Sequence, residues 1–170
     1  MSIRDMVCEW VASGDLIVLD PALDTTPTMR FVFVTKEVRE ALYGPWDDLE
    51  REVRYNRMRA VVDAFVAGAR MAVRYPPSRS AKAQIALLDP AADQVWEFRS
   101  REPRPGVRLF GSFLEPNTFV ALFTELRENI DDDFLKEKER CKREWRRFFP
   151  AYRPFSGGSL NSYVTNFHQV

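Results

Sequence analysis

Hydrophobic and polar residues follow two rhythms along this chain, one typical of helices and the other typical of strands. In the first half, apolar residues spaced three or four positions apart predict helices over residues 3–13, 35–42 and 46–69. Residues 31–34 (Phe-Val-Phe-Val) are β-branched and aromatic throughout and predict a strand, and residues 16–19 predict a shorter one. The first half therefore indicates a helix-rich region with few strands.

The second half changes to short apolar runs separated by turns that contain proline, glycine or asparagine, a pattern typical of consecutive antiparallel strands. A basic amphipathic helix then begins at the acidic cluster 131–133 and ends at Pro150. We predict an α+β fold with a small antiparallel sheet of about four to five strands, N-terminal helices packed on one face, and the basic helix at the C-terminal end. The predicted strands of this meander are residues 84–88, 95–99, 107–113 and 119–123.

Two arginines, Arg99 and Arg108, lie within or at the ends of these strands, where a charge needs either an open sheet face or a partner. Alternation places Arg99 on the same face as Glu97. Two interpretations follow. The arginines bind an anionic ligand such as phosphate, or they form cross-strand ion pairs with Glu97 or Glu115.

The charge of the chain is balanced overall but uneven along its length. At 170 residues with a formal net charge of zero, the chain is one domain in size and does not coat nucleic acid over its whole surface. Residues 1–98 hold 12 basic and 15 acidic side chains, whereas residues 99–170 hold 13 and 10. Any surface for an anionic partner is therefore expected in the second half.

The two cysteines, Cys8 and Cys141, are far apart and have no histidine or second cysteine at ligand spacing, so we expect no zinc site and no disulfide framework. No apolar run is long enough to span a membrane, and the N-terminus is unlike a signal peptide. We expect a cytoplasmic protein with reduced thiols, no membrane partner, no metal and no cofactor.

The order of strand, two helices, meander and closing helix resembles the RelE/ParE superfamily of toxins, in particular its HigB-like and phage-derived RelE-like branch. Trp96-Glu97-Phe98-Arg99 resembles the Glu-Leu-Arg strand of that branch, and residues 107–110 and 119–123 are similar to the two strands that follow. The resemblance covers residues 29–150. It divides the chain into an N-terminal extension (1–28), a RelE-like domain (29–150) and a C-terminal tail (151–170).

This resemblance implies a toxin of a toxin–antitoxin system, a metal-independent endoribonuclease (mRNA interferase) that acts on mRNA or at the ribosome and is neutralised by a small antitoxin protein. Cutting at the ribose 2′-oxygen needs cations to stabilise the developing charge and an acid–base pair to move protons. Arginine suits the first role because its planar donor fork matches phosphate oxygens. The residues that the resemblance assigns to catalysis are Arg108, Arg99 and Arg127, and those assigned to nucleic-acid binding are Arg101, Arg104, Lys142 and Arg146.

The chain also departs from the family pattern where that pattern places a histidine and paired lysines. Arg127 and Glu128 occupy the lysine positions, and the only histidine, His168, is the third residue from the C-terminus. Two alternatives therefore stand beside the ribonuclease. One is a non-catalytic protein- or nucleic-acid-binding module on the same scaffold, derived from a phage or mobile element. The other is a ParE-like poison of a DNA topoisomerase.

Overall fold

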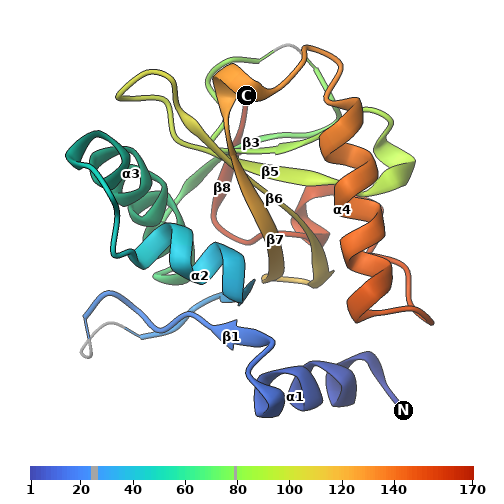
Figure 1. Ribbon diagram of the computed structural model, residues 1–170. Helices are drawn as coiled ribbons and strands as arrows, with labels where there is room; N and C mark the ends of the chain where they lie inside the picture. Colours follow the sequence, from blue (N-terminus) through green and yellow to red (C-terminus); the bar gives the residue numbers. More distant parts are fainter. Residues whose placement is uncertain (24–26, 79) are drawn as a thin grey trace.

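A single mixed sheet of eight strands, with helices on both of its faces, forms the framework of the protein (Figure 1). The computed structural model describes residues 1–23, 27–78 and 80–170. The helices are α1 (Ile3–Ser13), α2 (Lys36–Tyr43), α3 (Leu49–Val66) and α4 (Leu135–Phe148). The strands are β1 (Leu16–Val18), β2 (Phe31–Thr35), β3 (Met71–Arg74), β4 (Ile85–Leu87), β5 (Trp96–Arg99), β6 (Val107–Glu115), β7 (Thr118–Leu126) and β8 (Phe167–Gln169).

Side chains just before three helices fix where those helices begin. Ser2 and Asp5 form a capping box at the start of α1. The Thr35 hydroxyl accepts a hydrogen bond from the Val38 amide, and the Asp48 carboxylate accepts one from the Arg51 amide. These bonds satisfy amides that the first helical turn leaves without partners, so the local sequence sets the start of α1, α2 and α3.

The strand order is β1-β2-β7-β6-β5-β4-β3-β8. Strands β4 to β7 pair antiparallel in succession, as the meander pattern predicts. Three further pairs, β2 with β7, β3 with β4, and β3 with β8, are parallel. The prediction of a small antiparallel sheet of four to five strands is therefore wrong, because the meander is the centre of a wider mixed sheet.

The helices divide between the two faces of the sheet. Helices α2 and α3 cover one face together with the buried Leu160, Tyr163 and Val164 from the C-terminal segment. Helices α1 and α4 cover the other face, where the Trp10 ring meets the Phe148 ring edge-on at 5.3 Å. The N-terminal helices therefore do not share one face, which corrects the predicted arrangement. Among the residues described, no helix is long and apolar enough to cross a lipid bilayer.

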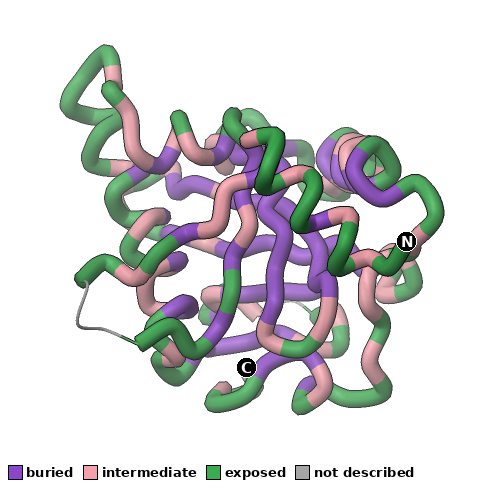
Figure 2. The backbone as a smooth tube through the Cα atoms, turned by 90° about the horizontal axis from the view of Figure 1, so that it is seen from below, coloured by how far each residue is buried: buried purple, intermediate pink, exposed green. Residues whose placement is uncertain are grey.

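Both ends of the chain belong to this sheet. Strand β1 pairs with β2 at one edge, and β8 pairs with β3 at the other edge. The Tyr163 side chain, shortly before β8, is fully buried. Figure 2 shows the buried strands running through the centre of the molecule, with exposed loops around them. The segments expected to be an extension and a tail thus contribute the two edge strands.

A buried arginine ties the C-terminal segment to the end of α3. Arg30 is 1 % exposed, and its guanidinium donates hydrogen bonds to the carbonyl oxygens of Phe65, Ala69, Thr165 and Asn166. No carboxylate pairs with it among the described residues. Its charge is offset by these carbonyl dipoles and by the Phe65 ring, whose centroid lies 4.9 Å from Arg30 Cζ. Burial lowers the pKa of Arg30 below its usual value.

A glycine in the middle of β6 allows the sheet to shift its register. At Gly111, where β6 shifts against β7, a Cβ atom would lie 1.9 Å from the Val120 carbonyl oxygen. We expect Gly111→Ala to lower the free energy of unfolding by about 2–3 kcal/mol, because the central strands cannot move apart freely. Urea unfolding measures this change in the free energy of unfolding. In the control Gly158→Ala the added methyl meets nothing within 4 Å, and equal midpoints for the two variants would contradict the expectation.

Candidate nucleic-acid interface

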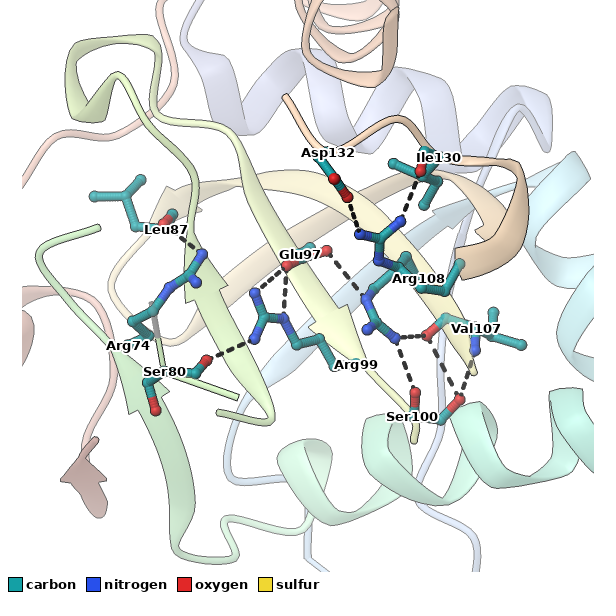
Figure 3. Close-up of polar contacts among 11 residues, drawn as sticks. Arg74, Ser80, Leu87, Glu97, Arg99, Ser100, Val107, Arg108, Ile130 and Asp132 are labelled. Atoms are coloured by element: carbon teal, nitrogen blue, oxygen red, sulfur yellow. Dashed lines mark hydrogen bonds and ion pairs between the residues drawn. The ribbon is translucent and has the colours of Figure 1, made fainter. Parts of the chain in front are cut away.

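Three arginines surround one buried glutamate on the α4-covered face of the sheet (Figure 3). We call Arg74, Arg99 and Arg108 the arginine cluster. In the register of the sheet, Arg99 lies opposite Arg108, and Arg74 lies in the same cross-strand row as Glu97, with Ala86 between them. Cross-strand partners point to the same face, so strands β3, β5 and β6 deliver these side chains to one place.

The Glu97 carboxylate binds two of the three guanidinium groups. Its Oε1 accepts from Arg99 Nε at 2.6 Å, and its Oε2 lies 3.5 Å from Arg108 Nε. The other nitrogens of these arginines reach backbone oxygens, with Arg99 bonded to the Ser80 carbonyl at 3.0 Å and Arg108 to the Ser100 carbonyl at 2.9 Å. Glu97 therefore forms one cross-strand ion pair, with Arg108 on β6, and one pair within β5, with Arg99. Glu115, the other candidate partner, instead binds Arg4.

Arg74 is the member of the cluster that the sequence reasoning missed. Among the described residues, its only hydrogen bond is a long one, 3.4 Å to the Leu87 carbonyl, and its buried Nε atom has no partner. The sequence does contain a signal for this arginine. The larger apolar residues Met71 and Val73 alternate with Ala72 and Arg74, a pattern typical of a short strand. This run has only four residues and lies just beyond the predicted helix 46–69, so no strand was predicted there.

The cluster holds more positive than negative charge in a site that is largely closed to water. The Glu97 side chain is 0 % exposed, that of Arg99 10 % and that of Arg108 14 %. Burial lowers the pKa of Arg108 to about 10; the Glu97 carboxylate opposes this shift, and the charges of Arg99, Arg127 and Arg101 add to it. Burial lowers the pKa of Arg74 as well. A bound anion would offset this excess charge.

Two further predicted residues lie at the rim of the cluster. Arg127 donates to the Ile130 carbonyl and lies 3.0 Å from Asp132 Oδ1, and Arg101 is exposed. Both are close enough to lower the pKa of Arg108. Arg104, on the same turn as Arg101, is exposed and paired with Glu102 at 3.3 Å. The structure thus brings Arg99, Arg101, Arg108 and Arg127 together, with Arg104 on the adjoining turn.

Lys142 and Arg146, the two residues predicted on the basic helix, lie elsewhere. They line a cleft beside α4 near the start of β5, where Lys142 pairs with Asp93 at 3.2 Å. This cleft touches Val95, just before β5, and Ser112 in β6, whereas the arginine cluster lies at Arg99 and Arg108, toward the other end of the same strand pair. The seven predicted residues therefore form two groups on the same face rather than one surface.

The groups that could move protons are engaged elsewhere. Glu97 is fully buried between its arginines, and the Glu125 carboxylate, opposite Arg108 on β7, accepts from the Leu126 amide and from Asn129. His168 lies on β8, which β4 and β3 separate from β5. The arrangement suits the binding of a phosphate group, and its arginines are poor proton shuttles near neutral pH.

Comparisons of the chain with protein-family models, with curated proteins and with solved structures gave no match. Over residues 1–23, 27–78 and 80–170, no group of three or more histidine, cysteine, aspartate or glutamate side chains is placed to hold a metal ion. The chemistry of the site therefore has to be argued from the arginines themselves.

Proposed function

We propose that the protein is a non-catalytic RNA-binding module in which the arginine cluster, with Arg101 and Arg127 at its rim, holds backbone phosphates. The observation that carries this proposal is that three largely buried guanidinium groups lie on one face of the sheet with a single buried carboxylate, Glu97, which pairs with Arg99 and Arg108 and, among the described residues, leaves Arg74 without an ion pair. Buried cations in excess of their counter-ions are costly unless an anion completes the site. Arginine forks match the oxygens of a phosphate, which makes phosphate the fitting anion.

RNA fits this site better than a free phosphate ion because the basic surface extends beyond it. Helix α4 carries seven basic and three acidic side chains and lies on the same face of the sheet. Successive phosphates of an RNA strand could contact the arginine cluster and this helix, whereas a single phosphate ion could contact only one of them. Because the net charge of the chain is zero, we expect RNA to bind at this basic face and not over the whole surface. The partner we propose is accordingly single-stranded RNA, either mRNA itself or RNA exposed on the ribosome.

The ribonuclease implied by the resemblance is the second candidate, and one observation favours it. Strand β2, helices α2 and α3, the meander β4 to β7 and helix α4 occur in the order that the resemblance implies, with β3 added before the meander, and Arg99 and Arg108 share a face. The two candidates bind the same ligand and differ in whether the ligand is cut. We place binding first because Glu97 is fully buried and ion-paired, and Glu125 Oε1 accepts two hydrogen bonds.

The proposal predicts that removing Arg101 weakens RNA binding. We expect Arg101→Ala to bind a fluorescein-labelled single-stranded RNA of twelve nucleotides about tenfold more weakly, the loss of one charge-assisted contact. Because Arg101 is exposed and outside the Glu97 pairs, the fold should be unchanged. Fluorescence anisotropy at fixed salt measures the affinity. The matched control is Arg4→Ala, an exposed arginine paired with Glu115. Equal affinities for both variants would contradict the proposal.

The same RNA separates the two candidates. Incubated with the protein, alone and in a translation extract, it should be recovered at full length. Cleavage that disappears in Arg108→Ala would reject the binding-only proposal and establish the ribonuclease. If the RNA is neither cut nor bound saturably, both candidates are rejected.

A further inference from the structure

We propose a second ligand site, in the cleft between α4, the adjoining ends of β5 and β6, and residues 152–156, which takes a small amphipathic anion: an aromatic or short aliphatic body with one anionic head group. The cleft has a volume of about 580 Å³, which is within the range of small-molecule sites. This proposal does not depend on RNA binding, since the cleft lies away from the arginine cluster. Along β6, Arg108 and Ser112 are separated by roughly 13 Å.

The floor of the cleft is apolar in character. Val95, Cys141 and Trp145 are buried there. Two polar groups that line the cleft already have partners within the protein. Trp145 Nε1 donates to the Tyr152 carbonyl at 2.9 Å, and Ser112 Oγ donates to the Gln94 carbonyl at 2.8 Å. Burial raises the pKa of the Cys141 thiol to about 12, so this side chain is neutral. A ligand body that meets this floor gains most by being apolar and flat.

The rim of the cleft is cationic. Lys142, Arg146 and Arg153 line it, and Asp93 is the only acidic residue of the lining. Lys142 is paired with Asp93. Within the described part of the chain, Arg146 and Arg153 make no ion pair and no hydrogen bond, and both are exposed. Two guanidinium groups above an apolar floor select a ligand with an anionic head and exclude cations.

The walls of the cleft are held in place before any ligand binds. Gln94 adopts a left-handed conformation with φ of 53°, and its side-chain oxygen accepts from the Tyr163 hydroxyl at 2.7 Å. The Phe155 amide bonds to the Phe113 carbonyl at 2.8 Å, which fixes residues 152–156 against the sheet. A non-glycine residue held at positive φ is uncommon outside functional or tightly constrained segments. A ligand would therefore bind without first having to order the site.

The test uses 2-naphthoate as the probe, titrated into the full-length protein by isothermal calorimetry, with 2-naphthalenemethanol as its uncharged counterpart and 2-naphthyl phosphate as the second anion. We expect naphthoate to bind at one site and the alcohol to bind at least about tenfold more weakly, because the alcohol lacks the charged head. If the phosphate binds more tightly than the carboxylate, the head group is assigned as a phosphate ester, and the opposite order assigns a carboxylate.

Two variants are compared with the parent protein. One carries both Arg146→Gln and Arg153→Gln, and the control carries Arg143→Gln, which changes an arginine of α4 that lies outside the cleft. All three arginines are exposed, so the variants should fold like the parent protein. We expect the double variant to lose about tenfold or more in naphthoate affinity and Arg143→Gln to match the parent. The inference is overturned by an absence of saturable binding, by equal affinity for acid and alcohol, or by equal affinity in the double variant and the parent.

Discussion

Glu97→Gln is expected to lower the free energy of unfolding by about 3–5 kcal/mol, because it removes the one carboxylate that Arg99 and Arg108 share. Glutamine keeps the size of the side chain, so packing changes little. It leaves the largely buried guanidinium groups of Arg99 and Arg108 without their shared counter-charge and points an amide donor at cationic donors. Unfolding in urea, followed by circular dichroism, measures the loss.

The control for this variant is Glu115→Gln, the same change on a carboxylate that pairs with the exposed Arg4. A surface pair of this kind contributes about 0–1 kcal/mol, so this variant should unfold close to the parent. Adding Arg99→Gln to Glu97→Gln should restore part of the lost stability, since one unpaired cation is removed as well. A Glu97→Gln protein as stable as the parent would show that the cluster does not depend on this charge.

Arg30→Met is expected to destabilise the protein by a similar amount, about 3–5 kcal/mol, by a different mechanism. Methionine fills much of the space but leaves the carbonyls of Phe65, Ala69, Thr165 and Asn166 without their donor. Two of these carbonyls lie at or just after the end of α3 and two lie just before β8. The variant should therefore loosen the pairing of β8 with β3 before the rest of the sheet opens.

Hydrogen exchange checks this local effect. The Val170 amide, bonded to the Val73 carbonyl, and the Met71 amide, bonded to the Asn166 carbonyl, should lose protection first. Arg57→Met, on the exposed face of α3, is the control and should leave both amides protected. If Arg30→Met left exchange at Val170 and Met71 unchanged while stability fell, Arg30 would support the core generally and not the C-terminal segment.

The sequence predicted the local elements well because their signals are local. Helical spacing and capping side chains such as Thr35 and Asp48 act within a few residues, and the turns of the meander fix β4 to β7 as successive neighbours. The width of the sheet was not predictable in this way. Strands β3 and β8 have four and three residues, and they pair in parallel across a long stretch of chain. No local pattern reports such a pairing.

The candidate site was predictable in part for the same reason. Alternation along β5 and β6 places Arg99 and Arg108 on one face and offers Glu97 as a partner. The presence of Arg74 depends on the pairing of β3 with β4, and the position of Lys142 and Arg146 depends on how α4 crosses the sheet. Both are set by packing between distant segments. The division of the predicted residues into an arginine cluster and a separate cleft therefore emerged only from the fold.

The salt dependence of RNA affinity tests most directly whether RNA phosphates are held at the arginine cluster and its rim, because each phosphate contact releases counter-ions from the RNA. For single strands, the slope of log affinity against log salt concentration changes by about 0.7 for each phosphate neutralised. The account predicts that RNA affinity falls with salt and that Arg101→Ala makes this slope shallower by about 0.7, while Arg4→Ala retains the parent slope. An unchanged slope in Arg101→Ala would mean that RNA phosphates are held elsewhere and would contradict the account.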